Sequence, residues 1–275
     1  SEFGLSPLMA VVDIETLDTQ PSAVILSIGC VVVNVFTGQE QRQVFYVNCD
    51  IDSQLKVGRT KDADTEAFWL NRDKTSQEAY DYAFGAKLED DEVIHSLPDA
   101  LELLNGYLQF VFGDERILLM GNGSEFDNAI LLDAMSQCNM KPAWDHGANQ
   151  SLRTAVWMGR MLLGIDPKYT LEFEDGEVKH HALHDAIHEA RYLCAIFQAF
   201  IPTEENRWKP LPQDLLELPS ELEFLAWCEN DQNWFTCVFD YESEDILFSN
   251  YTDGKYTSST DAGLNLTKYM LISDA

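Results

Sequence analysis

Four acidic residues lie where apolar segments end, at positions that allow their side chains to meet. Asp13 and Glu15 are two residues apart on a predicted strand, so both side chains lie on the same face of it. Asp127 follows a glycine-rich break after a short apolar run, and Asp185 lies in the first turn of a predicted helix. Clustered carboxylates repel one another, and divalent cations offset that repulsion. These residues therefore predict a metal site.

A cluster of this kind favours the hydrolysis of phosphodiester bonds. Two Mg²⁺ ions about 3.5–4 Å apart can bind the attacking and leaving oxygens of an in-line displacement. A histidine whose pKa is close to neutral can take the proton of the attacking water. His180 precedes Asp185 by five residues on the approach to the same helix, so it is a candidate for this role.

Hydrophobic periodicity predicts the elements that position these residues. The apolar segments 9–15, 23–35 and 43–47 predict three strands of an antiparallel meander. Residues 117–120 predict a further short strand. Helical patterns cover five segments: 64–84, 97–112, 126–137, 151–163 and 182–200.

The C-terminal part of the chain differs in character from the rest. Segment 203–220 is rich in proline and acidic residues, which predicts a linker. Beyond it, residues 233–239 and 246–251 predict strands, and Asp253–Gly254 predicts a hairpin turn. Residues 201–275 carry 15 acidic and 4 basic side chains, so this β-rich part is strongly negative.

The whole chain is acidic and rich in apolar residues. Its 275 residues include 47 acidic and 18 basic side chains, a formal net charge of −29. The 45% content of hydrophobic residues excludes a wholly disordered chain and is enough for a large core. The charge argues against non-specific binding to phosphate backbones. A nucleic-acid enzyme of this charge needs metal ions or a local basic patch.

The cysteines and apolar segments indicate the compartment. Cys30, Cys138 and Cys194 lie in apolar surroundings, and the cysteines form no CxxC pair. This scatter predicts free thiols and a reducing cytoplasm. No apolar run reaches roughly 18 residues, which predicts no membrane span, and residues 1–8 lack the features of a signal peptide. We therefore expect a cytoplasmic protein with no membrane partner.

Three segments resemble the motifs of the DEDDh 3′–5′ exonuclease superfamily. Residues 13–16 (DIET) resemble the first motif, DxET, and residues 123–127 (GSEFD) resemble the second, which ends in FD. Residues 180–185 (HHALHD) resemble the third, HxAxxD. The order and spacing fit over about residues 9–200. Within the superfamily, the chain is similar to phage DexA-type and ribonuclease-T-like exonucleases at three segments: 26–29, 65–70 and 121–123.

The resemblance implies an α/β fold of the ribonuclease-H-like type. A mixed sheet flanked by helices would span residues 9–202, with the small β-rich region 221–275 as an appendage. The implied activity removes nucleotides stepwise, as 5′-monophosphates, from the free 3′ end of single-stranded nucleic acid, with DNA favoured over RNA. His180 would be the general base and Glu15 a catalytic residue. Two Mg²⁺ or Mn²⁺ ions would be held by four ligands: Asp13, Glu15, Asp127 and Asp185.

Further residues are candidates for binding the substrate. In the families that the chain resembles, Thr16 and Leu17 often meet the 3′-terminal nucleotide. Phe68 and Trp69 could stack on an unpaired base or could dock a helix on the sheet. Many members carry an asparagine four residues before the second-motif aspartate. Here that position is glycine, and Asn122 comes one residue earlier. The sequence therefore leaves open whether Asn122 contacts the substrate.

Other histidines and acidic residues near the motifs are not expected to take part in catalysis. His184 and His188 have the spacing of a zinc half-site on a helix, but no HExxH motif or cysteine partner accompanies them. We therefore expect both on the solvent face. His181 could replace His180, although the spacing to the third-motif aspartate favours His180. Two acidic residues near the second motif are expected to be surface charges: Glu125 and Asp133.

The acidity of the chain also supports a second hypothesis of a different class. A binding module on an exonuclease scaffold could mimic nucleic acid and occupy the basic cleft of a protein partner. The acidic C-terminal region could carry this interaction, alone or alongside an active enzyme. The complete carboxylate and histidine set counts against a pure binder, which has no need of clustered charges. The oligomeric state stays open.

Overall fold

The computed structural model of the chain describes residues 6–40, 43–88 and 93–201, together with strands of the C-terminal part. The chain divides into two compact units, Ser1–Phe200 and Ile201–Ala275. The described strands of the second unit are 209–210, 224–228, 233–240, 245–250, 255–258 and 266–271.

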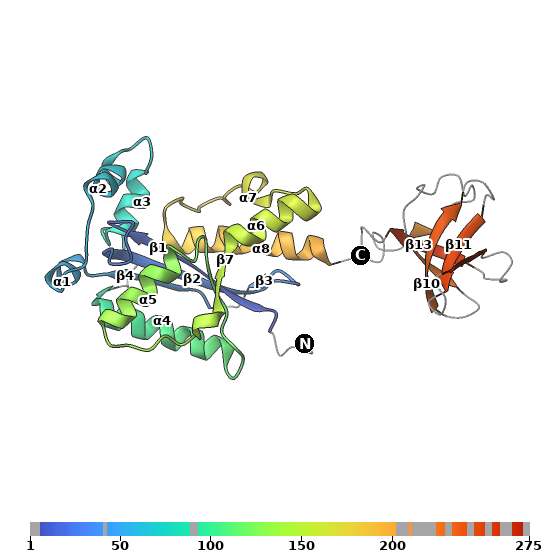
Figure 1. Ribbon diagram of the computed structural model, residues 1–275. Helices are drawn as coiled ribbons and strands as arrows, with labels where there is room; N and C mark the ends of the chain where they lie inside the picture. The colour runs from blue at the N-terminus through green and yellow to red at the C-terminus, as the bar shows by residue number, and fades with distance from the viewer. Residues whose placement is uncertain are drawn as a thin grey trace. The chain divides into compact units, whose positions relative to one another are not determined.

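A mixed sheet forms the centre of the first unit (Figure 1). Strands β1 (Leu8–Thr16), β2 (Ile25–Asn34) and β4 (Phe45–Cys49) pair antiparallel in the order β4-β2-β1, which confirms the predicted meander. The short strand β3 (Gln39–Glu40) pairs with β2, and β5 (Ile94–His95) lies parallel to β4 at one edge. Beyond β1, strands β6 (Leu119–Gly121) and β7 (Asn149–Ser151) continue the sheet in parallel.

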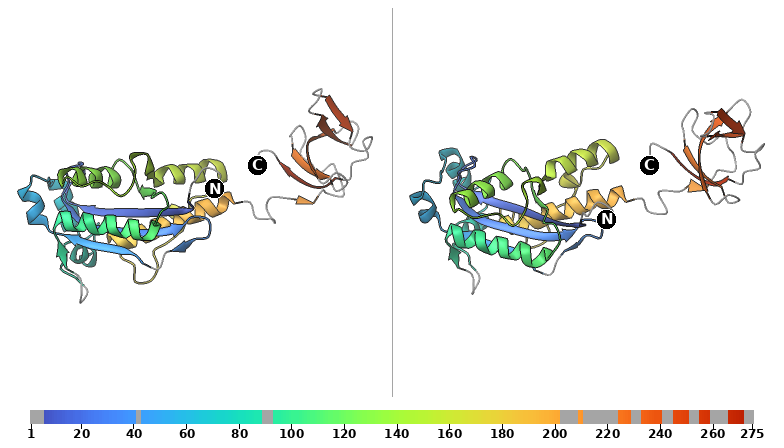
Figure 2. Two further views of the ribbon diagram at one scale, coloured as in Figure 1. Left: turned by 90° about the horizontal axis from the view of Figure 1, so that it is seen from below. Right: turned by 60° about the horizontal axis from the view of Figure 1, so that its bottom comes forward.

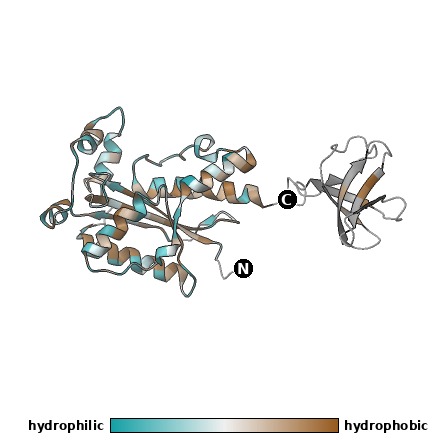
Figure 3. Cartoon of the chain, viewed as in Figure 1, coloured by the Kyte–Doolittle hydropathy of each residue, from teal (hydrophilic) through white to brown (hydrophobic). Residues whose placement is uncertain are grey.

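Helices cover both faces of this sheet (Figure 2), which explains why its central strands are apolar along their whole length. Helices α4 (Leu97–Phe112) and α5 (Asp127–Gln137) share a core with Val12 of β1. Helices α6 (Leu152–Met158) and α8 (Ala182–Phe200) share a second core with Val11. Hydrophobic residues therefore gather on the central strands, with hydrophilic residues in the loops around them (Figure 3).

Several elements differ from the sequence-based expectations. The prediction of one helix over residues 64–84 is wrong, because this segment forms two helices, α2 (Ala63–Leu70) and α3 (Gln77–Ala83). The Ser76 side chain accepts a hydrogen bond from the backbone N–H of Ala79, and this N-cap starts a new helix. The predicted helix 151–163 passes from α6 into a π-helical turn at Gly159–Leu163. Strands β3, β5 and β7 were not predicted, and neither were three short helical elements: α1 (Ile51–Lys56), a 3-10 turn (His146–Ala148) and α7 (Pro167–Thr170).

The start of α8 rests directly on β2 at Gly29. A Cβ atom at this position would overlap the backbone of Ala182 and Leu183. Glycine is therefore the residue that lets the two backbones approach so closely. This contact fixes the first turn of α8, where Asp185 lies, against the sheet.

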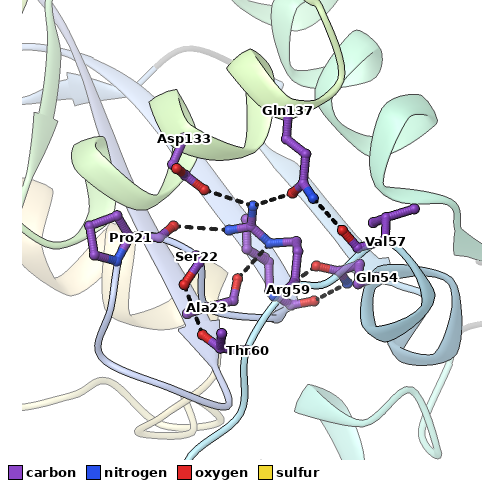
Figure 4. Close-up of polar contacts among 10 residues, drawn as sticks. Pro21, Ser22, Ala23, Gln54, Val57, Arg59, Thr60, Asp133 and Gln137 are labelled. Carbon is purple, nitrogen blue, oxygen red and sulfur yellow. Dashed lines mark hydrogen bonds and ion pairs between the residues drawn. The ribbon is translucent and has the colours of Figure 1, made fainter.

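A buried arginine fixes α5 against the β1–β2 connection (Figure 4). Arg59 is 3% exposed, and its Nε donates to the Ala23 carbonyl at 2.7 Å while its Nη2 donates to the Pro21 carbonyl at 3.1 Å. Its Nη1 donates to Asp133 Oδ1 and Gln137 Oε1 of α5, both at 3.1 Å. Asp133, expected to be a surface charge, has a 43% exposed side chain and forms this ion pair.

Replacing this arginine is expected to lower the free energy of unfolding. Arg59→Met leaves the carbonyls of Pro21 and Ala23 without a donor, so we expect a loss of about 3 kcal/mol in urea denaturation. Asp133→Asn, at the exposed end of the pair, should cost less than about 1 kcal/mol. Equal losses in the two variants would show that the contacts of Arg59 with the two carbonyls contribute nothing to stability.

The second unit contains an antiparallel sheet in the order β12-β11-β10-β9-β13-β8. The strands predicted at 233–239 and 246–251 correspond to β10 (Asn233–Asp240) and β11 (Asp245–Asn250). Within the predicted linker 203–220 only β8 (Lys209–Pro210) is described; the rest, and the predicted turn at Asp253–Gly254, lie outside the described residues. The remaining strands are β9 (Phe224–Cys228), β12 (Lys255–Ser258) and β13 (Leu266–Leu271).

The six cysteines are not joined by disulfides, as their scatter predicts. Cys138 is partly exposed, and the others are buried. In the part of the chain that the structure describes, no helix is both long and apolar enough to cross a membrane.

Candidate active site

The side-chain alternation of β1 directs two carboxylates toward α8. Met9 and Val11 share a core with Ala186 and Ala190 of α8. Successive side chains of a strand lie on opposite faces, so Asp13 and Glu15 follow Met9 and Val11 on this face. The first turn of α8 carries Asp185 on the side that faces them.

Asp127 is the first residue of α5, which begins close behind β6. The Asn128 side chain fixes this junction: its Oδ1 accepts from the Gly121 N–H at 3.1 Å, and its Nδ2 donates to the Leu119 carbonyl at 3.1 Å. A Cβ atom on Gly121 would lie 2.7 Å from the Asp127 Cβ, so the glycine-rich break makes room for the carboxylate. Asp127 is 2% exposed and lies beside the β1 carboxylates.

These elements enclose an open cavity of about 550 Å³. It brings together all five residues predicted for catalysis and metal binding: Asp13, Glu15, Asp127, His180 and Asp185. Ligand atoms of Glu15, His180 and Asp185 lie within 4.8 Å of one another. Basic side chains also line the cavity: Arg153, Lys168 and Lys179.

The electrostatics of the cavity fit divalent cations. Burial, and then the charge of Glu15, raises the pKa of Asp13 well above its ordinary range, and burial does the same to Glu15. Burial also raises the pKa of Asp127 and of Asp185 to about 7. Among the described residues, no ion pair involves these four carboxylates. Clustered hard oxygen ligands without an ion-pair partner are a donor set suited to Mg²⁺ or Mn²⁺.

His180 lies at the rim of the carboxylate cluster in a left-handed backbone conformation, with φ of 65°. Its backbone N–H donates to Asp185 Oδ2 at 2.9 Å, and its ring meets the edge of the Phe68 ring at 5.1 Å. Burial, and then the charge of Lys179, lowers the pKa of His180, so the imidazole is neutral at pH 7 and can accept a proton. His181 instead stacks against the Tyr46 ring at 4.4 Å and does not line the cavity.

Three of the predicted substrate-binding residues lie largely within the protein. Thr16 Oγ1 donates to the Asp18 carbonyl at 2.7 Å, and Leu17 is 4% exposed. Trp69 is 2% exposed and its Nε1 donates to the Thr16 carbonyl at 2.9 Å, so its ring docks α2 on the end of β1. Phe68 is only partly buried. With Thr16 and Trp69 it lines a second cavity, of about 460 Å³, that also reaches Glu15.

Asn122 lies in the main cavity, although its glycine neighbour occupies the position expected for asparagine. Its Nδ2 donates to the carboxylate of Glu189, and its Oδ1 accepts from Lys168 Nζ at 3.4 Å. Sequence reasoning missed Glu189, Lys168 and Tyr192, which all line the same cavity. Glu189 follows Asp185 by four residues on α8, and this helical spacing is the signal that could have identified it.

Two expectations about nearby residues have different outcomes. His188 is 8% exposed, so its predicted place on the solvent face is wrong. The Phe173 ring, from the segment before α8, stacks on the His188 ring at 4.2 Å and covers it. Glu125 is an exposed surface charge, as predicted, and forms an ion pair with Arg153.

Comparisons with known proteins identify a family and several similar solved structures. The 3′-5′ exoribonuclease Rv2179c-like domain matches residues 9–197. No curated protein matches the chain. The nuclease domain of 3′hExo, a DEDDh family member solved with bound rAMP, has 14% identity and a TM-score of 0.46, over 70% of this chain and 92% of that one. Cell-death related nuclease 4 has 14% identity and a TM-score of 0.48, over 70% and 64%.

The mixed sheet flanked by helices confirms the predicted α/β architecture. The prediction of a 3′–5′ exonuclease is confirmed by the family match over residues 9–197. Because the matched residues span most of the sequence and include all three motifs, the chain belongs to the family of the 3′-5′ exoribonuclease Rv2179c-like domain.

Proposed function

We propose that this exonuclease removes nucleotides from the 3′ end of single-stranded RNA in a reaction that depends on two divalent cations. The observation that carries the proposal is the joining of four carboxylates, two of them buried, and a histidine in one open cavity. The family is described by an exoribonuclease activity, which favours RNA over the DNA that we expected from the sequence. The phage DexA-type subtype and a protein partner for residues 221–275 stay predictions.

Each residue of the cavity has a defined task in this proposal. Asp13, Glu15, Asp127 and Asp185 would hold the metal ions, which when bound neutralise the scissile phosphate and polarise the attacking water. His180 takes a proton from that water at a ring nitrogen. The new bond from oxygen to phosphorus forms as the bond from phosphorus to the 3′ oxygen of the preceding nucleotide breaks. The terminal nucleotide leaves as a 5′-monophosphate, and the shortened strand keeps a 3′ hydroxyl.

Contacts to the strand would be few and local. Arg153, Lys168 and Lys179 line the cavity and supply positive charge beside the phosphate, in a chain whose net charge is −29. We propose that Phe68 stacks on the terminal base at the second cavity. Trp69 then acts indirectly, because it holds the backbone at Thr16.

The experiment uses matched RNA and DNA strands labelled at the 5′ end, with Mn²⁺ and the full chain. We expect kcat/KM for RNA to exceed that for DNA by about tenfold or more, since the 2′ hydroxyl can donate and accept hydrogen bonds. If DNA were hydrolysed as fast as RNA or faster, the proposed preference for RNA would be wrong, and the preference for DNA expected from the sequence would be supported. Failure to shorten either strand would contradict the proposed function.

A further inference from the structure

A fifth carboxylate, Glu189, is buried at the same cavity with one oxygen unused. Glu189 is 4% exposed, and its Oε1 accepts a hydrogen bond from Asn122 Nδ2. Its Oε2 is buried and has no hydrogen-bond partner among the described residues. A buried carboxylate oxygen without a partner is costly, so its presence calls for a ligand that the protein itself does not provide.

Glu189 lines the same cavity as the proposed metal ligands. Residues four apart on a helix lie on the same face, so Glu189 is one turn from Asp185 along α8. It lines the cavity together with Asp13 and Asp127.

Among the described residues, Glu189 forms no ion pair, although the charge of Lys168 opposes the rise of its pKa on burial. Lys168 Nζ contacts the Oδ1 of Asn122 at 3.4 Å, while the Nδ2 of the same amide donates to Glu189. Asn122 therefore stands between the two charges. Tyr192, one turn further along α8, also lines the cavity, and its buried hydroxyl has no hydrogen-bond partner among the described residues.

We propose that Glu189 is a fifth carboxylate of the metal site, with Oε2 as an oxygen ligand and Asn122 holding Oε1 in place. Mg²⁺ and Mn²⁺ accept several oxygen ligands, and an additional anionic one increases the affinity of the site. This proposal rests on metal binding by the proposed exonuclease and does not depend on whether the substrate is RNA or DNA.

A structural role for Glu189 makes a different prediction. In that case Glu189 would serve only to hold Asn122 through the hydrogen bond to Oε1. Glu189→Gln keeps an acceptor oxygen for Asn122 and removes the negative charge. The variant therefore separates the two roles: a metal ligand loses affinity for the ion, whereas a support for Asn122 does not.

The test is titration of metal-free full-length protein with Mn²⁺ by calorimetry. We expect Glu189→Gln to bind Mn²⁺ about tenfold or more weakly than the wild type, and to gain less thermal stability from saturating Mn²⁺. Glu172→Gln is the matched control, because it removes one negative charge at an exposed position outside the cavity. Its Mn²⁺ affinity should equal that of the wild type.

Each outcome has a distinct meaning. Unchanged Mn²⁺ affinity in Glu189→Gln would overturn the assignment of Glu189 while leaving the proposed function intact. A wild-type protein that binds no Mn²⁺ would contradict the proposed function itself. If Glu189→Gln does not fold, Glu189→Asp carries the test, since it keeps the charge but shortens the side chain. Weaker binding by this variant supports the proposal, and unchanged binding overturns it.

Discussion

Asp127→Asn is expected to lower kcat for hydrolysis at the 3′ end by about three orders of magnitude or more. The carboxylate is 2% exposed and lies in the same cavity as Asp13 and Asp185. An amide of the same shape removes a charge that holds the cations while leaving the packing of α5 in place. Single-turnover rates on labelled RNA, with saturating enzyme and Mn²⁺, measure the effect.

The same variant is expected to be more stable than the wild type when metal is absent. Burial raises the pKa of Asp127 from 3.8 to about 7, so the folded state binds more protons than the unfolded state between these values. Without metal, the free energy of unfolding therefore falls as the pH rises through this range. Above the range, the contribution of Asp127 to stability is fully lost. Asp127→Asn removes this contribution, and its stability should fall less steeply between pH 4 and pH 7.

Asp133→Asn is the matched control for this variant, because it makes the same change on the same helix outside the cavity. Its rate of hydrolysis should stay near that of the wild type. An Asp127→Asn variant that keeps its kcat within tenfold of the wild type would show that Asp127 does not serve the reaction. A melting temperature below that of the wild type at pH 8 would contradict the argument that burial of the charged carboxylate destabilises the metal-free protein.

His180→Ala is expected to lower kcat by about 10²–10⁴-fold, the usual contribution of a general base. His180 also offers a ligand atom within 4.8 Å of those of Glu15 and Asp185, so a role as base must be separated from a role as ligand. As a base, its loss should change Mn²⁺ affinity by less than tenfold, as calorimetry would show. Added imidazole should then restore part of the rate.

The exposed His146, remote in sequence from the motifs, provides the control, and His146→Ala should keep the wild-type rate. A parallel fall in Mn²⁺ affinity and kcat for His180→Ala would instead assign the imidazole to metal binding. No change in either quantity would exclude His180 from the site.

The carboxylates of β1 could be predicted from the sequence because the rule that places them is local. Strand alternation alone puts Asp13 and Glu15 on one face, and the apolar run before them marks a buried strand. The third motif likewise predicted that Asp185 opens a helix, which the structure confirms. Spacing along a single element was enough in both cases.

Features that depend on contacts between distant segments could not be predicted. Glu189 looks like a surface charge on an amphipathic helix, and only the approach of Asn122 from the segment after β6 makes it a cavity residue. His188 is covered by Phe173, which belongs to a segment without regular structure. The role of Trp69 depended on the Thr16 carbonyl, which is 53 residues away in the chain.

The most direct test of the central claim is the product pattern from a short RNA labelled at its 5′ end. Wild-type protein with Mn²⁺ should produce a ladder that shortens one nucleotide at a time from the 3′ end, with release of 5′-monophosphates. Asp127→Asn, or wild type with a chelator, should leave the strand intact. Internal cleavage, or an equal ladder from Asp127→Asn, would contradict metal-dependent exonucleolytic cleavage at this carboxylate cluster.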